Sequence, residues 1–123
     1  MRILVTGSRD WSWDGELYRR LDAYVAGAPG PIVVVHGDCP TGADHFAQLW
    51  AERYHNAVAE PHPALWKEDG YPQAGPMRNQ RMVDLGADVC IAFPLGVSRG
   101  TRDCMARARK AGIPVIDFGD GVS

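Results

Sequence analysis

The hydrophobic residues of this chain fall into short runs that are separated by longer stretches of mixed apolar and polar residues. Runs of this length, rich in β-branched residues and stopped by glycine or other turn-forming residues, predict strands buried on both faces. The clear runs lie at residues 3–5, 32–35 and 89–93, and weaker ones lie at 56–61 and 113–118. The sequence therefore predicts five strands.

Between these runs, apolar residues recur at steps of three and four, which predicts amphipathic helices. The predicted helices begin near Asp14, after Gly42, at Pro76 and at Arg99. The stretch HPALWKEDGYPQAG, residues 62–75, is rich in turn-forming residues near its end and predicts a long loop. A loop of that length in a compact domain is more often functional than accidental.

The alternation of strands and helices predicts an α/β protein, a single Rossmann-like doubly wound domain over residues 1–123. Right-handed crossovers then give a five-stranded parallel sheet in the order 3-2-1-4-5, with helices on both faces. In such a sheet the ligand binds at the carboxyl ends of the strands, where the strand order reverses. The loops at residues 7–10 and 94–101 meet at that point.

Composition and charge narrow the class of protein. With 46% hydrophobic and 23% charged residues, the chain is typical of a globular protein. Its net charge of −2 provides no field for a nucleic-acid duplex or an anionic membrane, so we expect neither as a partner. The opening apolar run is too short for a signal peptide or a membrane span, and the three cysteines lack disulfide or zinc spacing. We therefore expect a cytoplasmic protein without a cofactor.

The stretch FPLGVSRGTRDC, residues 93–104, leaves a strand and enters a predicted helix. Free N–H groups at a helix N-terminus attract anions, and hydroxyl and guanidinium groups strengthen that attraction. Its candidate ligand-binding residues are Gly96, Ser98, Arg99, Gly100 and Thr101. The alternative is an ordinary turn with a capping hydroxyl. Because the stretch lacks both a Walker A ending and a GxGxxG pattern, ATP hydrolysis and NAD-linked redox chemistry lose their main support.

Two further loops carry candidate binding residues. In TGSRD, Gly7 permits a sharp turn while Ser8 and Arg9 are able to reach a ligand; the alternative is a solvated loop. In HGDCPTGAD, Gly42 opens a helix and Asp44 lies in its first turn. Asp44 either contacts the ligand or complements the helix dipole.

Arg78 shares a helical face with Met82 and Leu85, so we expect it to point toward the sheet. A guanidinium in that position needs a partner, either a ligand phosphate or a carboxylate. The candidate carboxylates are Asp10, Asp38 and Asp44. The neighbouring Asn79 either reads a base or ribose or caps the helix.

Other chemistry-bearing residues define no clear site. The four histidines lack metal-ligand spacing, so no metal site is predicted. Cys104 lies on an apolar helical face and is expected to be a core thiol. Trp11, Trp13 and Trp66 either pack in the core or stack on a base.

Four segments, TGSRDW, HGDCPTGADHFAQLWA, ALWKEDGYPQAGPMRNQRM and AFPLGVSRGTRDCMARARKAG, together resemble the small YspA-like proteins of the SLOG superfamily. This group is also known as the domain of unknown function 2493, and its superfamily is named for DprA and the LOG phosphoribohydrolases. The resemblance implies a Rossmann-like fold and a nucleotide or a nucleotide-derived, ADP-ribose-like ligand. By the same resemblance, the residues that line the site are Gly7, Ser8, Arg9, Arg78, Asn79, Gly100 and Thr101.

LOG enzymes carry a Pro-Gly-Gly-x-Gly-Thr-x-x-Glu pattern with a catalytic glutamate, and Cys104 occupies that place in this chain. The first hypothesis is therefore a sensor or binding protein. The alternative is a nucleoside monophosphate phosphoribohydrolase, for which the weak catalytic candidates are Arg78, Asp103 and Asp44. A second alternative is single-stranded DNA binding by an oligomer. Superfamily relatives often pair, which makes a homodimer or higher homo-oligomer an open expectation.

Overall fold

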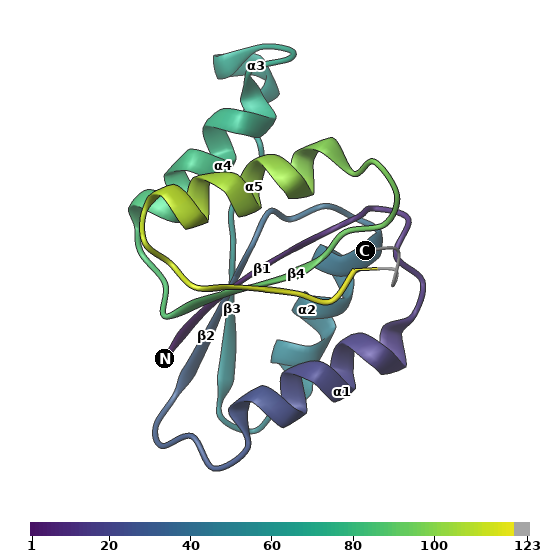
Figure 1. The fold of residues 1–123 in the computed structure, drawn as a ribbon, viewed down its shortest axis with the longest axis vertical. Coiled ribbons are helices and arrows are strands. Elements are labelled where there is room, and N and C mark those ends of the chain that lie inside the picture. The colour runs from purple at the N-terminus through teal and green to yellow at the C-terminus, as the bar shows by residue number, and fades with distance from the viewer. Residues whose placement is uncertain (120–123) are drawn as a thin grey trace.

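The computed structural model describes residues 1–119, so the last four residues of the predicted domain lie outside the described part. The elements follow in the order β1 (Arg2–Gly7), α1 (Asp14–Val25), β2 (Ile32–His36), α2 (Gly42–Arg53), β3 (Ala57–Pro61), α3 (Trp66–Asp69), α4 (Ala74–Asp84), β4 (Val89–Phe93), α5 (Arg99–Lys110) and β5 (Val115–Asp117). All strand pairs are parallel, and the sheet has the order β3-β2-β1-β4-β5. The predicted fold class and strand order are confirmed (Figure 1).

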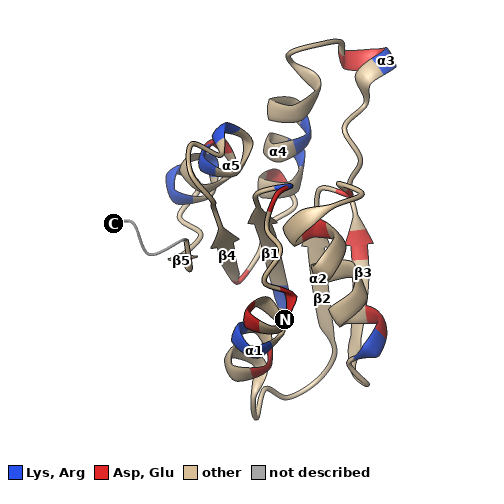
Figure 2. Cartoon of the chain, turned by 90° about the vertical axis from the view of Figure 1, so that its right-hand side faces the viewer, with Lys and Arg blue, Asp and Glu red and all other residues tan. Residues whose placement is uncertain are grey.

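Helices cover the sheet on both faces. Figures 1 and 2 show α1 and α2 on one face, with α4 and α5 on the other. The side chains of β1 alternate between these layers: Ile3 and Val5 pack in the core under α1 and α2, and Leu4 packs in the core under α4 and α5. All three side chains are fully buried, which explains why this strand is apolar without interruption.

The strand order reverses beside β1, which pairs with β2 on one side and with β4 on the other. Gly7 lies opposite Phe93 at the end of this register, and the N–H of Ser8 donates to the carbonyl of Phe93 at 3.0 Å. From this point the chain after β1 leads to α1 on one face, while the chain after β4 leads to α5 on the other. The two loops therefore diverge and leave space between them.

The predicted long loop contains structure that the sequence pattern did not indicate. Residues 66–69 form the short helix α3, and α4 begins at Ala74, two residues before Pro76. Proline is tolerated there because the first N–H groups of a helix have no acceptor within the helix. In Figure 2, α3 projects beyond α4, and an ion pair of 2.8 Å between Arg81 and Asp69 holds it to that helix.

Acidic and basic residues are interspersed along the elements of the fold (Figure 2). Acidic residues occupy the first turn of α1, and Arg107, Arg109 and Lys110 occupy the last turn of α5. Both arrangements complement the helix dipole. None of the helices within residues 1–119 has the length and apolar character that crossing a bilayer requires.

Candidate functional site

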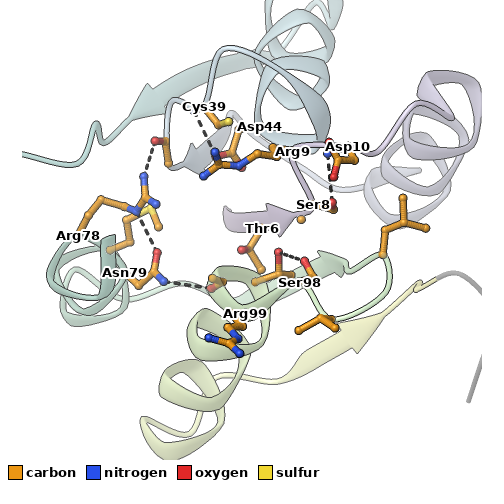
Figure 3. Close-up of a pocket in the computed structure, with 17 residues that line it drawn as sticks. Thr6, Ser8, Arg9, Asp10, Cys39, Asp44, Arg78, Asn79, Ser98 and Arg99 are labelled. Carbon is orange, nitrogen blue, oxygen red and sulfur yellow. Dashed lines mark hydrogen bonds between the residues drawn. The ribbon is translucent and has the colours of Figure 1, made fainter. Parts of the chain in front are cut away.

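A cleft of about 510 Å³ opens at the carboxyl ends of β1 and β4 (Figure 3). Clefts of this size commonly hold small-molecule ligands. Its lining comes from the loops after β1, β2 and β4, from α4 and from the starts of α2 and α5. The lining residues are Thr6, Gly7, Ser8, Arg9, Asp10, Gly37, Cys39, Asp44, Arg78, Asn79, Met82, Leu95, Val97, Ser98, Arg99, Gly100 and Thr101.

Most of the predicted ligand-binding residues are brought together in this cleft, but Gly42 and Gly96 are not among those that line it. Gly42 has a φ of +74°, and a Cβ at this position would lie 2.3 Å from the carbonyl oxygen of Ser8. It is required for the packing of α2 against the loop after β1. Gly96 has a φ of +62° and is exposed in the turn after β4.

The loop after β1 is held firmly by its backbone. The carbonyl of Ser8 accepts the N–H groups of Ala43 (3.1 Å) and Trp11 (3.2 Å). A Cβ on Gly7 would lie 2.4 Å from the Cβ of Ala43, so only glycine lets α2 start this close to β1. In contrast, the Arg9 side chain is exposed, and its guanidinium has no hydrogen-bond or ion-pair partner among residues 1–119.

The two tryptophans that follow this loop have different environments. Trp11 is only 3% exposed and packs against Phe93, with ring centroids 5.3 Å apart. Trp13 meets the Trp11 ring edge to face at 5.3 Å but remains 56% exposed. Trp11 is thus a core residue, and Trp13 lies at the surface beside the loop.

The first turn of α5 presents unpaired donors to the cleft. Ser98 precedes the helix in a left-handed conformation with a φ of +41°, and its hydroxyl donates to the Thr101 Oγ1 at 2.8 Å instead of capping the helix. The backbone N–H groups of Arg99, Gly100 and Thr101 therefore have no acceptor within the described part of the chain. The Arg99 guanidinium also lacks a partner there, and the residue is exposed.

Arg78 is held by neutral acceptors rather than by a carboxylate. Its Nε donates to the Asn79 Oδ1 at 2.9 Å, and its Nη1 donates to the carbonyls of Gly37 at 2.5 Å and His62 at 3.4 Å. No ion pair forms between Arg78 and any aspartate of residues 1–119, so the ion pair considered from the sequence is wrong. Nη2 has no partner within the same residues and lies at the cleft.

The predicted orientation of Arg78 is correct in part. Met82 is buried beneath α4, as its spacing from Arg78 predicts. Leu85, however, is 57% exposed. The helix ends at Asp84, so Leu85 falls in the turn before Gly86 and leaves the buried face.

Asn79 ties α4 to α5. The side chain is buried, and its Nδ2 donates to the carbonyl of Gly100 at 3.1 Å and to Asp103 Oδ2 at 3.0 Å. Since Oδ1 accepts from Arg78, both side-chain N–H donors and the oxygen are engaged. Asn79 therefore positions its neighbours; the structure supports neither reading of a base nor capping of the helix.

Asp103, a weak catalytic candidate from the sequence, is not one of the cleft-lining residues. Its carboxylate accepts from Arg107 Nε at 2.9 Å as well as from Asn79. Asn79 therefore joins Asp103 to α4, while the ion pair with Arg107 lies within α5, one turn further along that helix.

Gly37 is a site residue that the sequence patterns did not single out. A Cβ there would lie 2.5 Å from Arg78 Nη1 and 3.0 Å from Asp44 Oδ2. The missing side chain therefore lets the guanidinium reach the Gly37 carbonyl. The available signal was a glycine two residues after the apolar run 32–35, directly after the strand that pairs with β1.

Asp44 lines the cleft but is only 8% exposed, and its Oδ2 accepts the N–H of Cys39 at 3.3 Å. Burial raises the pKa of the Asp44 carboxyl, while the nearby His36 and Arg78 oppose that rise. The carboxyl is thus both a hydrogen-bond acceptor for the β2 loop and a titratable group in the cleft wall.

The two buried thiols and the buried His36 have structural partners. Cys104 is fully buried beside Cys90, which confirms the predicted core thiol, and this contact together with burial raises the pKa of Cys90. The Asp38 N–H donates to His36 Nδ1 at 3.0 Å, so His36 Nε2 carries the proton that is donated to Gln48 at 2.7 Å. Within residues 1–119, no group of three or more potential ligands is arranged to hold a metal ion.

The fold and the cleft together define a Rossmann-like α/β protein with a donor-rich cleft at its switch point. The sequence model of the YspA, cpYpsA-related SLOG family matches residues 1–68. Gene 61 protein of Mycobacterium phage D29 is 48% identical over 123 residues, which cover 97% of each chain. The chain belongs to the YspA, cpYpsA-related SLOG family, as its motifs predicted.

A solved structure with a similar arrangement is the C-terminal domain of a hydrogenase from Pyrococcus furiosus. The similarity covers 95% of this chain and 90% of that one, with a TM-score of 0.49 and 14% sequence identity.

Proposed function

We propose that this protein binds a nucleotide or a nucleotide-derived, ADP-ribose-like molecule, as a sensor or binding protein. The observation that carries the proposal is that three arginines with unpaired guanidinium donors, Arg9, Arg78 and Arg99, line one cleft. Membership of the SLOG family supports the same class of ligand.

The donors of the cleft suit phosphate oxygens. Three free N–H groups at the start of α5 coincide with the positive end of the helix dipole. Arginine adds charge-assisted hydrogen bonds, which are roughly twice as strong as neutral ones. The two aspartates of the lining, Asp10 and Asp44, do not outnumber these cations, and burial raises the pKa of Asp44. The cleft therefore favours an anion even though the whole chain is slightly acidic.

The experiment is calorimetric titration of the protein with AMP, GMP, ADP and ADP-ribose, repeated with the Arg9→Ala and Arg99→Ala variants. Each variant should bind at least about tenfold more weakly, since each loses a charge-assisted contact worth about 1.5 to 3 kcal/mol. Arg109→Ala is the matched control, because it removes the same charge from an exposed position at the other end of α5. Absence of binding by every nucleotide, or unchanged affinity in both cleft variants, would overturn the proposal.

A second candidate function is hydrolysis of the N-glycosidic bond of a nucleoside monophosphate. It is favoured by one observation: Asp44 is a buried cleft carboxyl with a raised pKa, the property expected of a general acid. Chromatography should then detect a free base released by the native protein but not by Asp44→Asn. Equal traces of base from both proteins would exclude this function.

A further inference from the structure

Asp44 stands apart from the other acidic residues of the cleft because it is buried without a cationic partner. The residue is more than nine-tenths buried, and among residues 1–119 no lysine, arginine or histidine forms an ion pair with it. Backbone N–H groups of Cys39, at 3.3 Å, and of Gly37 interact with its carboxyl. Burial still outweighs these contacts and raises the pKa of Asp44, so a carboxylate in this place is costly for folding, which points to a role in binding.

The surroundings of Asp44 limit which ligand group it can contact. The charged and titratable groups around it are His36 of β2, Arg78 of α4, Cys104 of α5 and Arg9 of the cleft lining. A phosphate is repelled by the carboxylate, and an ammonium group is repelled by the guanidiniums of Arg9 and Arg78. A neutral hydroxyl donor avoids both penalties and satisfies the carboxylate.

The position of Asp44 relative to Arg78 indicates where that hydroxyl lies in the ligand. Asp44 Oδ2 and Arg78 Nη1 both approach the space beside the Gly37 α-carbon, at 3.0 and 2.5 Å from the point that a Cβ would occupy. A phosphate held by Arg78 Nη2 therefore has its neighbouring group next to Asp44. In a nucleotide that neighbouring group is the ribose, whose vicinal hydroxyls are neutral donors.

The location also matches a general feature of α/β nucleotide sites. In dinucleotide-binding folds an acidic residue beyond the strand next to β1 accepts a hydrogen bond from the ribose hydroxyl. Asp44 follows β2, which pairs with β1, although it lies within α2 and not at the strand end.

We infer that Asp44 accepts hydrogen bonds from the ribose hydroxyls of the ligand, so that the cleft selects ribonucleotides over deoxyribonucleotides. This inference rests on the proposed nucleotide binding and adds the identity of the sugar to it. The proposed phosphate contacts of Arg9 and Arg99 do not depend on it.

The test compares AMP, GMP, ADP and ADP-ribose with their 2′-deoxy and 3′-deoxy forms by calorimetric titration. With the native protein, either the 2′-deoxy or the 3′-deoxy forms should bind at least about tenfold more weakly than the matching ribo forms, because a hydrogen bond to a charged acceptor is lost. Asp44→Asn should bind the ribo and deoxy forms with similar affinity. Asp84→Asn is the matched control and should retain the preference, since Asp84 is an exposed aspartate at the end of α4 that does not line the cleft.

Thermal unfolding of Asp44→Asn checks that the variant is folded. Because burial raises the pKa of Asp44 above its ordinary value of 3.8, the native protein loses stability as pH rises through and above that value. The variant has no charge to bury and should be the more stable protein at pH 7. This difference should shrink toward pH 4 and below, where both side chains are neutral.

The outcomes separate the inference from the function on which it rests. Equal binding of ribo and deoxy forms by the native protein would overturn the role of Asp44 and leave nucleotide binding intact. Retention of the ribo preference by Asp44→Asn would have the same consequence. If no nucleotide binds, the proposed function fails and the inference fails with it.

Discussion

The two sides of the cleft differ in how their arginines are held. On the α4 side, Arg78 is fixed by the side chain of Asn79 and by the carbonyl of Gly37. On the side formed by the loops, Arg9 and Arg99 are exposed, and their guanidiniums have no partner within residues 1–119. One side of the cleft is thus preorganised, and the other is free to adapt.

This difference has an energetic consequence for binding. Immobilising a long, flexible side chain at an interface costs about 0.5 to 1.5 kcal/mol. Arg78 has already lost that freedom during folding, while Arg9 and Arg99 lose it only when the ligand arrives. We therefore expect Arg78 to set where an anion binds, and the two loop arginines to adjust to its shape.

Among the variants that test this comparison, Asn79→Ala should lower stability most, because it removes the side chain that fixes Arg78 on the α4 side of the cleft. The change removes a buried side chain and leaves Arg78 Nε, the Gly100 carbonyl and Asp103 each without one partly buried hydrogen bond. The free energy of unfolding, measured with urea, should fall by about 2 to 4 kcal/mol. Gln73→Ala, which removes an exposed amide just before α4 that makes no capping hydrogen bond, should cost less than about 1 kcal/mol. Equal losses in the two variants would mean that Asn79 does not tie α4 to α5.

An intermediate effect is expected from Gly37→Ala. The new Cβ would lie 2.5 Å from Arg78 Nη1 and 2.8 Å from Cζ, so the guanidinium has to move away from the Gly37 carbonyl. Overpacking of this kind costs about 1 to 3 kcal/mol in unfolding experiments.

The control for this change is Gly15→Ala in α1. A Cβ at Gly15 meets nothing within 4 Å, so the alanine should leave stability unchanged or raise it by up to about 1 kcal/mol. If Gly37→Ala behaves like the control, Arg78 is not held in the way that we describe.

The smallest effect on stability should come from changes to the two loop arginines, Arg9 and Arg99. Arg9→Ala and Arg99→Ala remove side chains that have no partner within residues 1–119, so the free energy of unfolding should change by less than about 0.5 kcal/mol. Urea unfolding of the free proteins measures this directly. A larger loss would show that these arginines contribute to the folded state and that the two sides of the cleft are not as different as the contacts indicate.

The fold could be predicted because its signals are local. Short runs such as Ile3–Val5 alternate with helical periodicity, and the handedness of crossovers leaves few arrangements of the strands. The topology also predicts which loops meet where the strand order reverses, which is why Ser8, Arg9 and Arg99 were expected at one site. Local patterns were sufficient for these features.

The roles of individual residues could not be predicted in the same way, because their partners are distant in the sequence. Arg78 bonds to Gly37, which lies 41 residues away, and Asn79 bonds to Gly100, 21 residues away. No periodicity reveals such pairs. The exposure of Leu85 and the short helix at residues 66–69 likewise depend on where α4 begins and ends, the least certain aspect of a sequence pattern.

The paired indoles after β1 give the protein an intrinsic optical signal. Trp13 is half exposed, contacts the buried Trp11 and follows Arg9 by four residues in the same loop. We expect the proposed contact of Arg9 with an anion to change the surroundings of the exposed Trp13 ring and therefore its emission. Tryptophan fluorescence should then report the proposed binding at the cleft without an added label.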